Sequence, residues 1–244
     1  MSDFRIYGES APDLVPDSEG SPKLLRESRR LAASAGAAWI GQAWGLFTRR
    51  WGLWVGMSFV MLLITTVVSM LPLVGFLSNF LTLFFAGGMM LAAAALAEND
   101  DLEFVYLFGG FQHKFKELLI LTLLYFLVLL LVVFVFVVVM YLTGTNISDW
   151  DSEQPSVAAM AMYGWIILAG FAALVPVSMM MWFATVLTVL DDVAPWQAMK
   201  MSFQGCVRNI LPFIVYGLVW LGLSLVIGLL AMGLVMLFDW VWLP

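Results

Sequence analysis

Few residues in this chain have side chains that could perform chemistry. There is one cysteine, Cys206, and one histidine, His113, so an intrachain disulfide and a bis-histidine haem site are excluded. A structural zinc site needs about four Cys, His or carboxylate ligands, and a nucleophile activated by histidine would have to use one of these two residues. We therefore expect no catalytic residue, no metal site and no cofactor. We interpret His113 as a surface residue and Cys206 as a small apolar one.

Two acidic pairs, Asp100-Asp101 and Asp191-Asp192, are the remaining candidates for acid–base chemistry. On the cytoplasmic face of a membrane they could act on lipid headgroups, as in a membrane enzyme. Each pair also precedes a predicted amphipathic helix, where aspartate accepts hydrogen bonds from free N–H groups and favours the helix dipole. Because capping explains the pairs more simply, we expect them to be structural, and we expect that the chain is not an enzyme.

The elements that must position these residues are those of an integral membrane protein. Of the 244 residues, 63% are hydrophobic and 11% are charged, whereas globular proteins have roughly 45–50% and 25%. A soluble fold of this length needs far more polar surface. The composition therefore excludes an ordinary soluble protein, and we expect membrane lipids and other membrane protein subunits as partners, with no nucleic acid.

Five apolar runs are long enough to cross a bilayer, which takes about 20 helical residues. They predict an all-α polytopic membrane helix bundle whose spans are residues 52–71, 76–97, 117–142, 157–190 and 209–238. Pro176 predicts a kink in the long fourth run. The chain thus divides into a polar cytoplasmic tail, 1–30, which we expect to be disordered when alone, and a membrane domain, 31–244.

The basic residues predict the orientation of the chain. All 11 lysines and arginines fall on one side of the membrane if there are five spans and the N-terminus is cytoplasmic. The opposite loop, 143–156, carries three acidic residues and no basic one. Splitting 157–190 into two spans would export Lys200 and Arg208. The positive-inside rule therefore predicts a cytoplasmic N-terminus and a C-terminus on the far side.

An internal repeat organises the predicted fold. Residues 92 positions apart match without a gap, including Phe104 with Trp196, and the informative pairs are Asp100 with Asp192, Phe111 with Phe203, and Gln112 with Gln204. Each copy has an acidic start, an amphipathic helix and a basic residue where the next span begins. The repeat predicts interfacial elbow helices at 101–115 and 194–207, with a weaker third copy at 37–50. We expect five aromatic side chains to pack these elbows: Phe47, Phe104, Phe111, Trp196 and Phe203.

One stretch of the second copy also carries a family resemblance. The residues Ser202-Phe203, Cys206, Arg208-Asn209 and Pro212-Phe213, together with the repeat of elbow and hairpin, resemble a family of bacterial inner-membrane proteins. That family is similar to the membrane domain joined to some glycerophosphodiester phosphodiesterases. The resemblance covers about 35–244 and implies a bacterial inner (cytoplasmic) membrane, with the C-terminus in the periplasm. Members usually have six spans, whereas five are predicted here, and no catalytic residue carries over.

The polar and small residues of the spans predict packing rather than transport. Asn79, Gly87, Gly88 and Gly170 are of the types that bring membrane helices together. The interior of the predicted spans has no ionisable residue, the usual mark of an ion path. We therefore favour an accessory or scaffold subunit of a larger membrane complex. A transporter, channel or lipid-handling protein is the alternative, and the internal repeat supports it.

The arginines near the N-terminus are candidates for contact with lipid. A cluster formed by Arg29, Arg30, Arg49 and Arg50 could bind anionic lipid headgroups. The same residues could serve only to orient the chain, which is an equally good interpretation.

Overall fold

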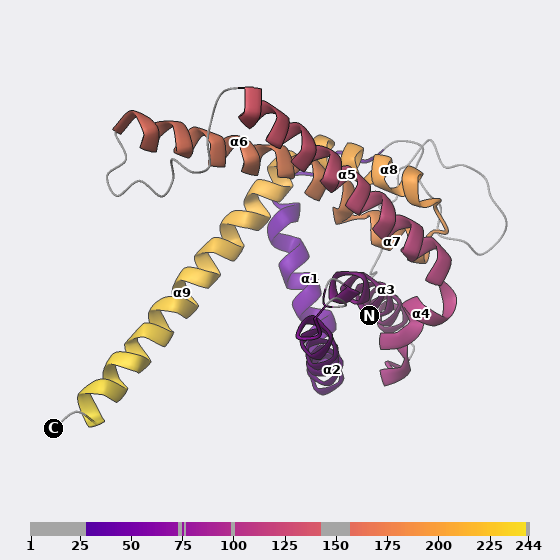
Figure 1. Ribbon diagram of the computed structural model, residues 1–244. Coiled ribbons are helices and arrows are strands. Elements are labelled where there is room, and N and C mark those ends of the chain that lie inside the picture. Colours follow the sequence, from indigo (N-terminus) through magenta and orange to yellow (C-terminus); the bar gives the residue numbers. More distant parts are fainter. Residues whose placement is uncertain (1–27, 73–74, 76, 99–100, 143–156, 243–244) are drawn as a thin grey trace.

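The structure, a computed structural model, describes residues 28–72, 75, 77–98, 101–142 and 157–242, and all regular elements in these ranges are helices (Figure 1). They are α1 (Ala35–Arg49), α2 (Trp51–Ser69), α3 (Leu77–Ala97), the 3-10 turn η1 (Phe104–Phe108), α4 (Gly109–His113), α5 (Phe115–Leu142), α6 (Val157–Trp182), α7 (Ala184–Leu190), α8 (Pro195–Arg208) and α9 (Ile210–Trp242). The predicted all-α fold is confirmed. Nearly all of the predicted tail, 1–30, and the loop 143–156 lie outside the described residues.

Five helical stretches of the described chain are long and apolar enough to cross a membrane: α2, α3, α5, α6 with α7, and α9. The multi-span architecture is therefore as predicted. Pro176, the position at which the sequence predicts a kink, lies inside α6. The helix continues through Pro176, and the interruption between α6 and α7 falls at Phe183 instead.

The middle elbow is not the single helix predicted over 101–115. It consists of η1 followed by the five-residue α4, whereas α1 and α8 are continuous helices. Gly109 and Gly110 explain the difference, because they bring this segment against α3. A Cβ at Gly110 would lie 2.2 Å from the backbone oxygen of Phe84, and one at Gly109 would lie 2.8 Å from Leu91 Cδ1. The two matched copies of the repeat therefore differ in local structure.

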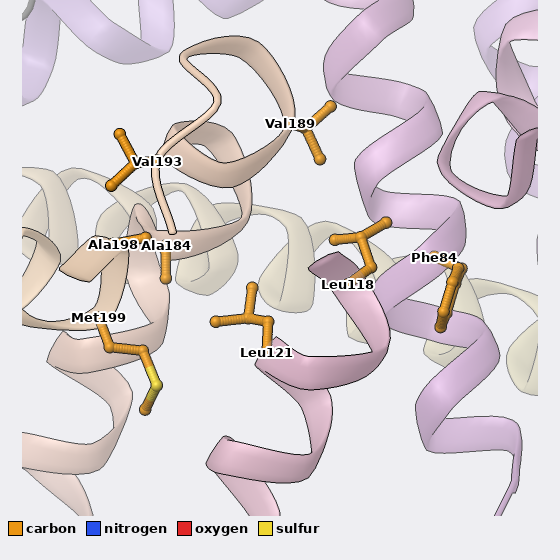
Figure 2. Close-up of a cluster of buried hydrophobic side chains, with 8 residues drawn as sticks. All are labelled: Phe84, Leu118, Leu121, Ala184, Val189, Val193, Ala198 and Met199. Atoms are coloured by element: carbon orange, nitrogen blue, oxygen red, sulfur yellow. The ribbon is translucent and has the colours of Figure 1, made fainter. Parts of the chain in front are cut away.

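The core consists of two apolar clusters that meet at α3. The first joins α3, α5, α7 and α8 (Figure 2), and its buried members are Phe84, Leu118, Leu121, Ala184, Val189, Val193, Ala198 and Met199. The second joins α2, α3 and η1, and its buried members are Met57, Phe85, Ala92, Leu96, Leu102 and Leu107. Phe111 of α4 links them, since its ring lies 4.8 Å from that of Phe84 and 5.1 Å from that of Phe85.

Burial is confined to one end of the long helices. In α5, no described side chain after Thr122 is buried. In α6, none before Val177 is buried, and in α9, none after Pro212 is buried. Figure 1 shows α9 extending away from the other helices toward the C-terminus. We call these long exposed parts of α5, α6 and α9 the outer halves. In a bilayer, such apolar surfaces contact either lipid or another helix.

Candidate functional site: a polar junction and an apolar groove

A side chain from α8 holds the interruption between α6 and α7. The Ser202 hydroxyl accepts a hydrogen bond from the Phe183 N–H at 2.9 Å and donates one to the Met179 carbonyl at 2.7 Å. In an unbroken helix these two backbone groups, four residues apart, would bond directly to each other. Insertion of a side chain into the hydrogen-bond ladder is a known cause of helix bending. It explains why the helix is interrupted at Phe183.

Cys206 lies one turn beyond Ser202 on the same face of α8. Its Sγ is 3.5 Å from the Met179 carbonyl oxygen, and the residue is buried. Burial raises the pKa of the Cys206 thiol to about 11, although the hydrogen bond with Ser202 opposes the shift. The thiol is therefore protonated at neutral pH, which is the unreactive form.

Asn209 fastens the N-terminal segment to the start of α9. Its Nδ2 donates to the carbonyl oxygens of Arg29 and Gly205, each at 2.8 Å, and its Oδ1 accepts from the Leu31 N–H at 2.8 Å. Arg208 adds a bond from Nη1 to the Ser28 carbonyl at 2.9 Å. Because Asn209 is buried, these bonds satisfy a side chain that would otherwise be costly to bury.

Close packing of α1 on α9 continues this attachment. A Cβ at Gly36 would lie 2.0 Å from the Pro212 carbonyl oxygen and 2.8 Å from the Tyr216 nitrogen, so only glycine permits the approach. The Trp39 ring lies 5.4 Å from the ring of Phe213. The residues 28–49 and the first two turns of α9 thus form one packed unit.

Sequence reasoning missed the roles of Ser202, Asn209 and Gly36. The signal for the first two was present, since residues 202, 206 and 209 are separated by four and three positions and share one helical face. Ser202, Cys206 and Asn209 all belong to the stretch that carried the family resemblance. Gly36 gave no signal, because nothing local marks one glycine in a helix as a crossing point.

The pair Asp191-Asp192 does not cap α8, which corrects the sequence prediction for that helix, and Asp100 of the other pair lies outside the described residues. The N-cap of α8 is Ala194, and no side chain caps it. Asp192 has a left-handed backbone (φ 55°) and pairs with Lys114, and Arg50 pairs with Asp101 at 2.7 Å. The first turn of α8 begins with Pro195, as predicted. Because Ala194 before it is extended, the Asp192 side chain lies too far from the first N–H groups of α8 to cap them. The two ion pairs join different elbows and are solvent-exposed enough to contribute little energy.

Asp191 differs from its neighbour because it is partly buried. This burial, followed by the charge of Asp192, raises the pKa of the Asp191 carboxyl above its usual 3.8. No group of three or more His, Cys, Asp or Glu side chains that could hold a metal ion occurs within the described part of the chain.

The predicted aromatic contacts of α8 are not those observed. Trp196 and Phe203 are 48% and 37% exposed, and Trp196 packs beneath the Lys200 ammonium at 5.1 Å from its ring centroid. The buried face of α8 instead carries four smaller or flexible side chains: Ala198, Met199, Ser202 and Cys206. Small side chains let α8 approach α6 and α7 closely enough for Ser202 to reach the backbone.

The other predicted elbow aromatics have mixed positions. Phe111 lies between the two core clusters. Phe47 is half-buried, with its ring 5.6 Å from that of Trp44. Phe104 is 38% exposed and lies over Gly56, at whose position a Cβ would be 3.9 Å from the Phe104 ring.

The glycines predicted at helix contacts all face another helix. A Cβ at Gly88 would lie 2.3 Å from the carbonyl oxygen of Leu107 in η1, and one at Gly87 would lie 3.0 Å from Leu118 Cδ1 in α5. At Gly170 the nearest atom is 3.4 Å away, in the ring of Phe136. Asn79 is exposed near the start of α3.

The four arginines divide into two pairs. Arg49 donates to the Leu96 carbonyl oxygen at 3.2 Å, so it and Arg50 tie the end of α1 to the neighbourhood of α3 and η1. Arg29 and Arg30 are exposed, and the Arg29 carbonyl is held by Asn209.

An apolar groove lies between the outer halves of α5 and α6. Its volume is about 1050 Å³, and its lining is hydrophobic, including Leu131, Val135, Phe136, Trp165, Ala169 and Ala173. A smaller hollow of about 430 Å³ also borders Phe136 and Met140 and includes Gly170. With no polar group to orient a reactant, the groove suits an apolar occupant such as an acyl chain or a helix.

The helical fold, the five apolar stretches and the interlocked elbows define a multi-pass α-helical membrane protein. Over 205 residues the chain is 31% identical to a probable inner membrane protein of Burkholderia thailandensis, and the match covers 80% of this chain and 75% of that protein. The chain belongs to the family of that inner membrane protein. No family model matches the chain, and no solved structure matches it.

Proposed function

We propose that this inner-membrane protein is a non-enzymatic accessory or scaffold subunit of a larger membrane assembly. The observation that carries the proposal is the extent of the outer halves of α5, α6 and α9, which have no buried side chain among the described residues. Gly164 of α6 and Gly217 of α9 lie there, and a Cβ at either would meet nothing within 4 Å. Small residues in lipid-embedded helices suit contact with another helix.

The polar groups of the chain support the same proposal. Ser202 and Asn209 are engaged with backbone groups of this chain, and the predicted spans have no ionisable residue in their interior. These residues therefore build the fold rather than mark an ion path. The suggested similarity to the membrane domain joined to some glycerophosphodiester phosphodiesterases is compatible with a part that assists another protein.

The proposal includes an orientation and a lipid contact. The N-terminus is cytoplasmic and the C-terminus periplasmic, since this places all 11 basic residues inside. The exposed side chains of Arg29 and Arg30 then face the cytoplasmic leaflet, where anionic headgroups attract them.

Lipid handling is the second candidate function. The specific observation that favours it is the groove between α5 and α6, which is apolar and large enough for acyl chains. The polar junction at Ser202 would then set the angle of α6, and hence the width of the groove.

The test is affinity purification of the tagged full chain from native membranes in mild detergent, followed by mass spectrometry. We expect a stoichiometric membrane protein partner. The matched variant is Gly164→Leu, which enlarges the outer half of α6 at a position whose Cβ has open space around it, and it should reduce recovery of the partner. Recovery of the chain alone, as a monomer or homo-oligomer, would contradict the accessory role. Co-purified phospholipid in place of protein would favour lipid handling.

A further inference from the structure

In the outer half of α9, the Cβ positions of the four described glycines, Gly217, Gly222, Gly228 and Gly233, have no heavy atom within 4 Å. The main contacts of α9 are to α1 and α8, and it also meets α6 through the Trp182 and Phe213 rings near its start. Gly217 and Gly228 have no atom within 4 Å of a Cβ position. At 100° per residue they share one face of α9 with Ser224 and Ala231. This small-residue face would let another helix approach closely.

The groove between α5 and α6 and the small-residue face of α9 lie at similar distances, counted along their helices, from the point where α6 and α9 meet. The Trp182 ring, at the end of α6, lies 5.3 Å from the Phe213 ring, near the start of α9, so the two helices meet there. The α6 residues of the groove, 161–173, lie nine to twenty-one positions before Trp182. The same numbers of positions beyond Phe213 lead to residues 222–234, which include Ser224, Gly228 and Ala231.

The groove and α9 also match in size and chemistry. The groove holds about 1050 Å³, several times the roughly 150 Å³ cavity that accommodates one benzene ring. It therefore has space for a row of side chains. Both surfaces are apolar, so neither would bury an unpaired charge in the other.

The chain cannot bring its own α9 into its own groove without breaking a packed unit. The base of α9 is held by the backbone contact at Gly36, by Trp39 and by the Asn209 bonds. With this base in place, α9 diverges from α6 (Figure 1). While these contacts persist and α9 keeps this direction, it is the α9 of a second molecule that has access to the groove.

We propose that the chain forms a symmetric dimer in which residues 222–236 of α9 lie in the α5–α6 groove of a second copy. The α9 helices of the two copies would run in the same direction through the membrane, because both copies have the same topology. If one face of this 15-residue stretch is covered in each of two reciprocal contacts, the interface buries roughly 1,400 Å². Specific protein interfaces bury about 1,200–2,000 Å². The proposal does not depend on an accessory role.

Cysteine cross-linking in native membranes tests the dimer. In a Cys206→Ala background, one tagged copy carries Ala169→Cys and a differently tagged copy carries Gly228→Cys. Disulfide formation needs Cβ atoms about 3.5–4.5 Å apart. We expect a cross-linked species that carries both tags. The matched control is Val226→Cys, which is at the level of Ala169 but about 200° around the helix from Gly228, and which should cross-link about ten-fold less.

A second measurement keeps the test informative if cysteine variants fold poorly. A Cβ at Gly228 has no heavy atom within 4 Å, so we expect Gly228→Leu to leave the monomer folded but to lower the dimer fraction about ten-fold in native mass spectrometry. Val226→Leu should leave that fraction unchanged. A cross-link within one chain carrying both Ala169→Cys and Gly228→Cys would overturn the dimer and show that α9 folds back. A monomer with phospholipid bound, and no cross-link, would overturn it in favour of acyl chains.

A different protein partner in the groove would likewise overturn the dimer, because it would abolish the two-tag species. The accessory role is judged separately, by whether a different protein co-purifies. Either proposal can therefore fail while the other stands.

Discussion

At the scale of single residues, the hydroxyl of Ser202 on α8 bonds to the backbone at the interruption between α6 and α7. It replaces one direct backbone hydrogen bond of a long helix with two bonds through a side chain from another helix. The two helical segments on either side are then free to differ in direction. A serine that sequence patterns treat as an ordinary polar residue thus sets the geometry of a membrane span.

Replacing Ser202 with Ala should destabilise the protein. The change removes both hydroxyl bonds, and leaving a buried donor or acceptor unsatisfied costs about 1–3 kcal/mol. Thermal unfolding in detergent, followed by circular dichroism, measures the effect. Ser178→Ala is the control, because the Ser178 hydroxyl is exposed and bonds only within its own helix, to the Val175 carbonyl. Equal stability of the two variants would contradict a structural role for Ser202.

Asp191 should make stability depend on pH. Its carboxyl has a pKa above 3.8 in the folded state, so the folded chain binds the proton more tightly than the unfolded chain. Stability should therefore increase as the pH falls through the raised pKa toward 3.8, and decrease again on return to neutral pH.

Asp191→Asn tests this dependence. We expect the variant to unfold at a higher temperature than the wild type at about pH 7, and the difference to shrink as the pH approaches about 4. Unfolding temperatures across this range give the result, and Glu98→Gln, at an exposed carboxylate near the end of α3, is the control. A variant that unfolds earlier than the wild type at neutral pH would refute the stated sign.

At the scale of helices, close backbone contact decides which elements pack. Gly36 of α1, Gly88 of α3 and Gly110 of α4 each face a backbone oxygen of another element at a distance that excludes a Cβ. Glycines in the outer halves of α6 and α9 mostly meet nothing. Glycine content alone therefore does not reveal a helix contact, and the two groups should respond oppositely to substitution.

Gly88→Ala should weaken the contact between α3 and η1. The new Cβ would lie 2.3 Å from the Leu107 oxygen and 2.6 Å from the Tyr106 oxygen. Both atoms belong to the backbone, so the segments must separate, and overpacking of this kind costs about 1–3 kcal/mol. Gly164→Ala, with open space at its Cβ, should be neutral or gain up to about 1 kcal/mol from helix propensity. Unfolding curves of the two variants in the same detergent compare their stabilities. A smaller loss of stability for Gly88→Ala than for Gly164→Ala would contradict the close contact between α3 and η1.

At the scale of the whole molecule, the contacts that hold the helices together lie at one end, and the exposed apolar surfaces lie at the other. The core clusters, the ion pairs and the Asn209 bonds gather around the elbows. The outer halves of α5, α6 and α9 project from this base with apolar surfaces. This division suits a protein that is anchored by its elbows and that offers its outer halves to a second copy or another partner.

The orientation is a property of the whole molecule and can be measured directly. Alkaline phosphatase is active only outside the cytoplasm, so a fusion after Asp151, in the loop without basic residues, should be active. A fusion after Gln204, on α8, should be inactive, and a fluorescent protein that matures in the cytoplasm should give the reverse pattern. Activity of the phosphatase at Gln204 would overturn the positive-inside assignment.

The amino-acid sequence alone determined that this is an all-helical, multi-pass membrane protein. Apolar runs can be compared directly with the thickness of a bilayer, and helices satisfy their own backbone groups in lipid. Only the tertiary structure decided where the fourth span breaks, which face of α8 is buried and what Asp192 pairs with. The reason is that these depend on contacts between distant residues, such as Phe183 with Ser202 and Arg29 with Asn209, 180 positions apart. Hydropathy cannot predict such contacts, because lipid and a protein neighbour are equally apolar environments for a leucine.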